Sequence, residues 1–390
     1  MIRQPTLRRI ETFPLEHQLP NGGFGPSKVS VLARSATLVK VTTSDGIVGW
    51  GESFGPPRIV AAYLEDLARA VIGKPLEVRE GTWLNRLSTG YHLTTGGLHV
   101  AAISGLDTAM WDAAARTYDV PVSALLGGRV RDEVTAYAST GYYHDKGDSG
   151  PLRAYIEEAV AEGFTSAKIK IGSGVRDDAE RTGIARELLG PTGVLMVDYN
   201  ANATVDTVLA SLREVTTFDP YWIEEPLPPD EIRGWAMLRN QTGLSLAAGE
   251  ALYTRFGFRD YIAEKRIDVV QPNLSVCGGF TEAKVISQMA TAWNLRVAPH
   301  VWGTGVLIAA TLQLLSTLPT SPFGERNAYA PMLEYDRGEN PFREGVLKEP
   351  ILAQNGRVQV PTGSGLGVEI NEDAVRMWAL PTHTLDITSP

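Results

Sequence analysis

The chain has only one cysteine, Cys277, so an internal disulfide is excluded and a reducing compartment is expected. No apolar run is long enough to cross a bilayer, and the first residues lack the charged, apolar and cleavage regions of a signal peptide. Net charge is −9 with acidic and basic residues interspersed, which gives nucleic-acid binding no electrostatic support. Low-complexity segments are missing too. We therefore expect a soluble, cytoplasmic protein with no nucleic-acid or membrane partner.

The composition that remains is that of an ordinary globular protein, with 43% hydrophobic and 21% charged residues among 390. That length exceeds one average domain but suits an α/β barrel with an appended domain. Near the N-terminus, residues 37–52 predict a hairpin around Asp45-Gly46, and residues 101–118 predict a helix. Strands followed by helices without alternation indicate an α+β domain over residues 1–130.

From residue 131 to 355, short apolar runs alternate with helical segments, a pattern typical of parallel βαβ units. The runs are VTAYAST, SAKIKIG, VLMVDYN, YWIEEP, SLAAGE, VVQPN and RVAPH. With a later return they approach the eight units of a TIM-like barrel. A doubly wound open sheet is the alternative, but no G-x-G-x-x-G fingerprint follows a strand. Residues 356–390 have strand and Gly-rich turn character, and we expect them to return to the first domain.

Most of these runs end in a polar residue, at the strand ends where such barrels place their chemistry. The terminal residues are Lys170, Asp198, Glu224, Glu250, Asn273 and His300. Three consecutive carboxylates meeting there would resist ionisation unless a cation compensates them. All-oxygen ligation favours Mg²⁺ before Mn²⁺. The alternative is that these are surface carboxylates at loop starts.

Lys168 and Lys170 lie two apart on one strand and therefore face the same side, towards the barrel interior. Beside a cation and each other, at least one is expected to have its pKa lowered towards neutrality, which would make it a competent general base. The competing interpretation is a solvated strand end. His300, on the opposite side of the barrel mouth, becomes a second proton-transfer group, although alone it would be read as structural.

The remaining histidines show no metal-ligand spacing; they are His17, His92, His99, His144 and His383. We interpret them as structural or surface residues, except that His144, in the loop after the first barrel strand, is a candidate substrate contact. Cys277 is interpreted as a small buried residue.

Four motifs in order carry a family resemblance: K-x-K at Lys168 and Lys170, D-x-N at Asp198 and Asn200, WIEEP, and AAGE. Across essentially the whole chain they resemble the enolase superfamily, specifically its mandelate racemase subgroup. The resemblance implies a modified (β/α)7β barrel and an α+β capping domain built from both termini. It also implies a homo-oligomer, from dimer to octamer.

The resemblance further implies roles for individual residues. Asp198, Glu224 and Glu250 would bind one Mg²⁺ per subunit, with Mn²⁺ as a substitute. Lys170 would be the base, Lys168 would support it and contact the substrate carboxylate, and His300 would be the second acid/base. The implied substrate contacts are Asn200, Glu334, Trp302 and, in a mobile specificity loop, Gly22, Gly23 and Phe24.

The chain departs from the subgroup at Asn273, where an aspartate normally hydrogen-bonds the histidine. An amide can accept that hydrogen bond and orient the ring but supplies no charge, so His300 is expected to be a poorer base. This weighs against a symmetric two-base racemase and favours abstraction by Lys170 alone. The segments PHVWGTG and LEYDRGENPFREGVL resemble aldarolactone cycloisomerases and acid-sugar dehydratases.

The resulting hypothesis is a Mg²⁺-dependent enzyme acting on a small-molecule hydroxy-carboxylate, an acid sugar or its lactone. Lys170 would remove the α-proton and the β-oxygen would leave, giving a 2-keto-3-deoxy acid. One alternative is a racemase or epimerase of a hydroxy or amino acid derivative. The alternative from another class is an inactive homologue that binds sugar acids.

Overall fold

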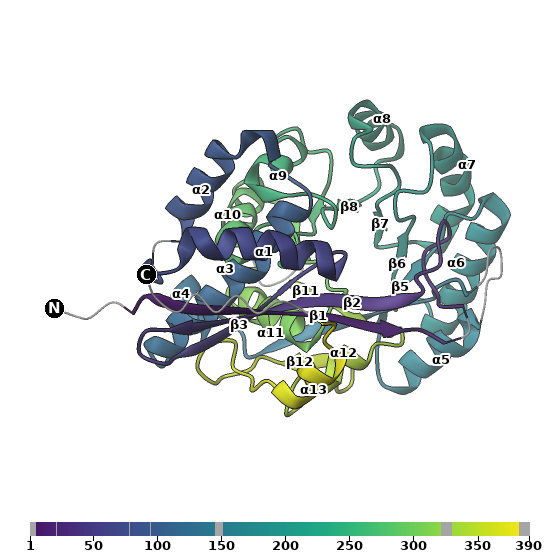
Figure 1. Ribbon diagram of the computed structural model, residues 1–390. Coiled ribbons are helices and arrows are strands. Elements are labelled where there is room, and N and C mark those ends of the chain that lie inside the picture. The colour runs from purple at the N-terminus through teal and green to yellow at the C-terminus, as the bar shows by residue number, and fades with distance from the viewer. Residues whose placement is uncertain are drawn as a thin grey trace.

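The computed structural model describes residues 5–20, 22–77, 79–93, 95–144, 151–320 and 330–381. Two sheets organise the molecule: an antiparallel sheet of order β1-β2-β3, and a larger one of order β10-β9-β8-β7-β6-β5-β4-β11 in which β12 also pairs with β4. Figure 1 shows β1 and β2, in purple, crossing the front of the molecule. Within the described ranges, no helix combines the length and apolar character needed to span a membrane.

The capping domain begins with the small sheet. Its strands are β1 (Leu7–Gln18), β2 (Ala33–Thr43) and β3 (Val48–Ser53). The predicted hairpin is confirmed, because β2 and β3 pair antiparallel and Gly46 has the positive φ of 87° that this turn requires. The helices that follow are α1 (Pro57–Val71), α2 (Glu80–Thr89), the 3-10 turn η1 (Tyr91–Leu93), α3 (Leu98–Thr117) and α4 (Val122–Leu126). The predicted helix over residues 101–118 is confirmed as α3, which begins three residues earlier and ends one residue earlier than predicted.

Eight parallel strands form the large sheet. They are β4 (Glu133–Thr140), β5 (Ser166–Lys170), β6 (Val194–Asp198), β7 (Trp222–Glu224), β8 (Leu246–Ala248), β9 (Val269–Val270), β10 (Arg296–Val297) and β11 (Met332–Asp336). Their order in the sheet follows the chain and never reverses, and β11 returns beside β4. A doubly wound sheet would need a reversal, so the curled barrel is confirmed.

Seven helices connect these strands, one after each strand except the last. They are α5 (Leu152–Ala161), α6 (Val175–Leu189), α7 (Val205–Val215) with the 3-10 turn η2 (Thr216–Phe218), α8 (Ile232–Thr242), α9 (Thr254–Ala263), α10 (Gly279–Ala292) and α11 (Gly305–Leu315). In Figure 1 the teal helices α5 to α8 cover the right side of the barrel. This is the expected (β/α)7β arrangement.

The barrel interior is packed with side chains and is not an open pore. Six buried residues, on or directly after β4, β6, β7, β8, β9 and β10, form one cluster in this interior: Tyr137, Met196, Trp222, Ala247, Val269 and Ala298. This layer closes the barrel from beneath, so the polar strand ends face only the C-terminal mouth.

Small residues join the capping domain to the barrel through α3. A Cβ on Gly51 would lie 2.1 Å from the carbonyl oxygen of Gly105, and one on Gly49 would lie 2.2 Å from that of Ala109. On the other side of α3, a Cβ on Gly279 at the start of α10 would lie 2.5 Å from Asp107 Oδ2. Any larger residue at these three positions would clash with α3. The glycines therefore allow α3 to pack closely between β3 and α10.

The C-terminal segment joins both domains. After α12 (Pro341–Gly345), β12 (Arg357–Gln359) pairs antiparallel with β4 of the barrel sheet. The last helix, α13 (Glu372–Trp378), lies next to β1, where the Leu380 amide donates to the Pro14 carbonyl at 2.7 Å. Figure 1 shows this segment in yellow below the small sheet. The tail thus returns to the capping domain only after contributing a strand to the barrel.

Glu52, in β3, caps the N-terminus of α11 across the interface between the two domains. Its carboxylate accepts hydrogen bonds from the Thr304 amide at 3.1 Å, the Thr304 hydroxyl at 2.6 Å and the Leu307 amide at 3.1 Å. Burial outweighs these donors and raises the pKa of Glu52 to about 7.

This raised pKa predicts a pH-dependent stability. The folded state holds the Glu52 proton more tightly than the unfolded state, so the stabilisation is present below pH 4.5 and is lost as pH rises through 7. Relative to Glu52→Gln, the free energy of unfolding should fall by about 3 kcal/mol across this window. Denaturant unfolding of both proteins at half-unit pH steps measures the difference. If the free energies of unfolding of the two proteins changed in parallel with pH, Glu52 would have the same pKa in the folded and unfolded states.

Candidate active site

Three carboxylates converge at the C-terminal mouth of the barrel. Asp198 ends β6, Glu224 ends β7, and Glu250 follows β8 by two residues, so three adjacent parallel strands deliver them to one edge. One oxygen of each lies within 4.8 Å of the others. The structure therefore brings together the three residues that the sequence selected as metal ligands.

The surroundings of these carboxylates suit a hard divalent cation. Glu224 Oε2 accepts from Trp222 Nε1 at 3.0 Å and from Gln271 Nε2 at 2.7 Å, which fixes its orientation. Glu250 Oε2 is buried, and His300 Nε2 lies 3.2 Å from it. An all-oxygen donor set of three carboxylates fits Mg²⁺.

The pKa values of the carboxyl groups at this site also favour a bound cation. Burial raises the pKa of Glu224 to about 8, although Lys168 acts in the opposite direction. Burial, followed by the charges of Glu250 and Asp198, raises the pKa of Glu225 well above its usual value. A cation at this position would relieve both carboxyl groups.

Lys170 lies beside the cluster, on the neighbouring strand β5. Its ammonium is 2.6 Å from Asp198 Oδ2 and 5.7 Å from the centre of the Tyr142 ring. Burial is the largest single effect and lowers the pKa of Lys170, but the charges of Asp198, Glu250 and Glu224 together outweigh it, and the net direction is upward. The lowered lysine pKa expected from the sequence applies to a site with a bound cation and stays a prediction. Although burial opposes ionisation of Asp198, the Lys170 and Lys168 ammonium groups hold its pKa below the usual value.

Lys168, two residues earlier, is fully buried and held by acidic partners. Its ammonium lies 2.7 Å from Glu334 Oε1 and also contacts Glu224. Burial opposes its charge, but these carboxylates raise the pKa of Lys168 well above the usual value. Lys168 is therefore a fixed positive charge and not a base.

Glu334 is held by several donors in the barrel wall. Besides Lys168, it accepts from the Ser139 hydroxyl at 2.7 Å and the Val301 amide at 3.0 Å. Although burial opposes ionisation, Lys168 and His300 lower the pKa of Glu334 to about 2. Glu334 therefore positions Lys168, and its direct contact with a substrate carboxylate stays a prediction.

His300 is oriented by Asn273, but not as the sequence predicted. The Oδ1 of Asn273 accepts from the Ser275 amide at 2.8 Å, and an amide N–H can only donate. The other half of the Asn273 side chain, Nδ2, therefore faces His300 Nδ1 at 2.9 Å and donates to it. The expectation that Asn273 accepts this hydrogen bond is wrong. Neutral His300 must carry its proton on Nε2, which lies 3.2 Å from Glu250 Oε2.

Arg34, at the start of β2, joins the capping domain to the rim of the barrel mouth. Its Nη2 donates to Asp336 Oδ2 at 2.6 Å and its Nε to the Glu339 carbonyl at 2.8 Å. The guanidinium lies 4.0 Å from the ring centre of Trp302. On the same carboxylate, Asp336 Oδ1 accepts from the Tyr142 hydroxyl at 2.8 Å.

The predicted specificity loop lies against this rim. Gly25 and Tyr143 exchange backbone hydrogen bonds at 2.8 and 2.9 Å. Phe24 is buried and packs on Tyr142, with ring centres 4.9 Å apart. Gly23 cannot carry a side chain, because its Cβ would lie 2.0 Å from the Val31 carbonyl oxygen. Gly22, with φ of 81°, is exposed at the tip of the loop.

Of the remaining residues discussed from the sequence, some lie near the barrel mouth and others are buried elsewhere in the fold. His144 Nε2 is 2.5 Å from the Tyr155 hydroxyl, and its ring centre lies 6.0 Å from that of Phe24, so it lies behind the loop. Asn200 donates its backbone amide to Asp198 at 2.8 Å, and its buried Oδ1 has no partner among the described residues. Cys277 is buried and His99 is buried beside Tyr63. His383 lies outside the described residues.

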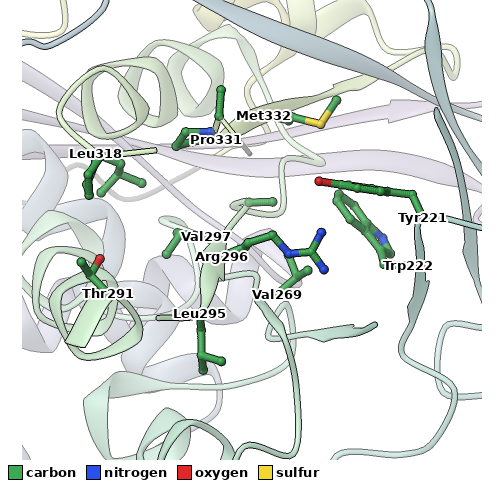
Figure 2. A pocket seen from close by; sticks show the side chains of 13 residues that line it. Tyr221, Trp222, Val269, Thr291, Leu295, Arg296, Val297, Leu318, Pro331 and Met332 are labelled. Atoms are coloured by element: carbon green, nitrogen blue, oxygen red, sulfur yellow. The ribbon is translucent and has the colours of Figure 1, made fainter. Parts of the chain in front are cut away.

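A separate pocket lies at the opposite end of the barrel. Its lining includes the first residues of four strands: Trp222, Val269, Arg296 and Met332 (Figure 2). Its interior holds only about 30 Å³. The N-terminal ends of barrel strands carry stability and not chemistry, so this pocket is not the active site.

Sequence reasoning missed Arg34, Tyr142 and Asp336. Asp336 could have been found, because it lies two residues after Glu334 on β11 and must face the same side. Arg34 left no such signal. It lies on a capping strand 302 residues from its partner, and only the fold brings the two together.

Comparison with known proteins gives two family matches. Residues 10–127 match the mandelate racemase/muconate lactonizing enzyme N-terminal domain, and residues 152–374 match the enolase C-terminal domain-like family. The D-galactarolactone cycloisomerase of Agrobacterium fabrum is 38% identical over 373 residues, 95% of this chain and 98% of the relative. A D-galactonate dehydratase of Xanthomonas campestris pv. campestris is 32% identical over 351 residues, 87% of this chain and 90% of the relative.

A solved structure is similar over nearly the full length. The 3,6-anhydro-D-galactonate cycloisomerase from Zobellia galactanivorans superposes with a TM-score of 0.85 at 29% identity, covering 96% of this chain and all of that one.

Proposed function

Because the chain belongs to the mandelate racemase/muconate lactonizing enzyme family of the enolase superfamily, we propose that it is a Mg²⁺-dependent acid-sugar lactone cycloisomerase. The observation that carries the proposal is the Lys170 ammonium beside the three-carboxylate cluster at the barrel mouth. A base placed next to the site of a carboxylate-binding cation is what α-proton abstraction requires.

Asp198, Glu224 and Glu250 would hold the metal, which supplies positive charge for the substrate carboxylate and for the enediolate that follows. Lys168 is fixed by Glu334 and adds a permanent positive charge next to the carboxylate cluster. Lys170, whose Nζ lies beside Asp198, would accept the α-proton at that atom in its neutral form.

Elimination is favoured over racemisation because the partner that orients His300 at Nδ1 is the uncharged amide of Asn273. A two-base racemase needs a base on each face of the substrate. The Nδ2–H of Asn273 makes His300 Nδ1 an acceptor, so neutral His300 presents Nε2–H, a donor, to the site. His300 can give a proton from that atom but not take one. One-base abstraction by Lys170, followed by loss of the β-oxygen, fits this arrangement.

The second candidate is dehydration of an open-chain acid sugar. The Nε2–H of His300 could donate a hydrogen bond to the departing hydroxyl group, and the Xanthomonas relative is named a D-galactonate dehydratase. Both reactions share proton abstraction by Lys170 and differ only in the leaving group.

The test is incubation of the Mg²⁺-loaded protein with acid sugars and their lactones in D₂O, read by NMR and by 2-keto acid formation. A lactone converted to a 2-keto-3-deoxy acid supports the proposal. Conversion of open-chain acids alone establishes the dehydratase. Epimers of unchanged mass would indicate a racemase, and tight binding without exchange would indicate the inactive homologue.

The Asn273→Asp variant tests the role of His300. An aspartate would accept from Nδ1–H and leave Nε2 free of its proton, creating a second base. We expect the variant to exchange the α-proton of the opposite epimer with solvent, which the wild type does not, and to shift the pH–rate profile. Deuterium incorporation into each epimer measures it. An unchanged profile and no new exchange would show that His300 takes no part.

A further inference from the structure

Arg34 is a buried cation whose partners satisfy only some of its hydrogen-bond donors. The side chain is almost fully buried, and Nε and Nη2 are fixed by Glu339 and Asp336. Its remaining nitrogen, Nη1, is buried and has no hydrogen-bond partner among the described residues. Such an N–H pair costs free energy unless something binds it. Because the rest of the fork is anchored, Nη1 cannot turn away to find a partner.

The surroundings of Arg34 form part of the active-site rim. Tyr142 connects the two positive groups, because its ring lies under the Lys170 ammonium while its hydroxyl donates to the carboxylate that holds Arg34. Trp302, two residues after His300, stacks on the guanidinium. Gly338 is required here, since its Cβ would lie 2.7 Å from both Arg34 Nη2 and the Phe24 ring. Arg34 is therefore built into the site.

The chemistry of Arg34 selects between leaving groups. A guanidinium binds an anion with parallel N–H donors but does not release a proton. Hydroxide is a strong base whose conjugate acid, water, has a very high pKa, so it needs a proton to leave. A lactone ring oxygen leaves as a carboxylate, whose conjugate acid has a pKa of about 4, and needs only a stabilising cation.

We infer that Arg34 Nη1 binds the carboxylate that forms at the remote end of the substrate when a lactone ring opens. This inference rests on the proposed function and specifies its substrate as a lactone whose ring oxygen is β to the carbon acid. Lys170 takes the α-proton; the electron pair forms the Cα–Cβ double bond and breaks the Cβ–O bond. The ring oxygen keeps that bond's electrons as part of the new carboxylate. The enol then takes a proton at Cβ and loses its hydroxyl proton as the 2-keto group forms, so the net reaction is an isomerisation.

Arg34→Gln tests the inference, because loss of the leaving group follows proton abstraction and the two steps can be read separately. With the lactone of a dicarboxylic sugar acid, such as galactarolactone, we expect kcat to fall about a hundredfold with KM nearly unchanged. Abstraction should continue, so unreacted lactone recovered from D₂O should carry deuterium at its α-carbon faster than product forms. Arg34→Lys keeps the positive charge but not the planar, forked guanidinium, and its kcat should lie between those of the wild type and Arg34→Gln.

Several results would overturn the inference. If exchange and turnover fall together in both variants, Arg34 only supports the fold. A rise in KM with unchanged kcat would show that Arg34 binds the intact substrate and does not stabilise the leaving carboxylate. Arg337→Gln is the matched control, since that side chain follows Asp336 but points to Glu158 and Glu162, and it should behave as wild type. A wild type that neither exchanges nor converts any lactone would refute the proposed function itself.

Discussion

Lys170→Met is expected to lower turnover by about 10⁴-fold or more and to abolish deuterium incorporation at the α-carbon. Methionine keeps an unbranched stem of similar length against Tyr142 but has no amine, so the proton acceptor is lost while the packing is kept. Steady-state 2-keto acid formation and NMR of the recovered substrate in D₂O measure the two effects.

The control for this variant is Lys348→Met, which removes an exposed lysine whose backbone amide donates to Glu369 in the C-terminal segment, and it should leave both rates unchanged. Retention of exchange in Lys170→Met would assign proton abstraction to another group. Loss of turnover with exchange intact would place Lys170 after the first step, and either result would refute its role as the base.

Glu250→Gln is expected to weaken Mg²⁺ binding by a hundredfold or more and to reduce turnover at limiting metal in proportion, by about the same factor. Glu250 is the ligand without a lysine partner, and replacing it removes a charge from the cluster without breaking a lysine–carboxylate pair. Isothermal titration with Mg²⁺ measures the affinity directly. A ligand that binds only the folded state also raises Tm, so added Mg²⁺ should stabilise the wild type and not the variant.

Glu264→Gln, at an exposed position after α9, is the matched control and should keep the wild-type response to Mg²⁺. Equal affinity in Glu250→Gln and wild type would remove Glu250 from the ligand set. A similar rise of Tm in both proteins would lead to the same conclusion.

The barrel and its polar mouth could be predicted because each rests on local signals. Alternation of apolar runs with helical segments identified the strands, and a polar residue at each run's end identified the mouth. In parallel strands, adjacency in the chain becomes adjacency in space, which is why Asp198, Glu224 and Glu250 could be grouped before any coordinates were known.

The rest depended on information that a linear pattern does not hold. The direction of the hydrogen bond at His300 is set by the Ser275 amide, whose approach to Asn273 no motif records. The pKa of Lys170 depends on one oxygen of Asp198 being within 2.6 Å. The entry of β12 into the barrel sheet, ahead of the contact between α13 and β1, followed from pairing with β4 and not from composition. Arg34 and its partners are joined only through tertiary contact.

The pairing of Arg34 with Asp336, and of Phe24 with Gly338, has an evolutionary consequence. In the proposed function, substrate choice at this rim would be encoded jointly by two stretches of sequence about 300 residues apart. A single substitution in either stretch leaves its partner mismatched, so new specificities should arise through compensating double changes. Laboratory recombination that exchanges the first domain between relatives should therefore yield active chimaeras only when residues 336–340 travel with it.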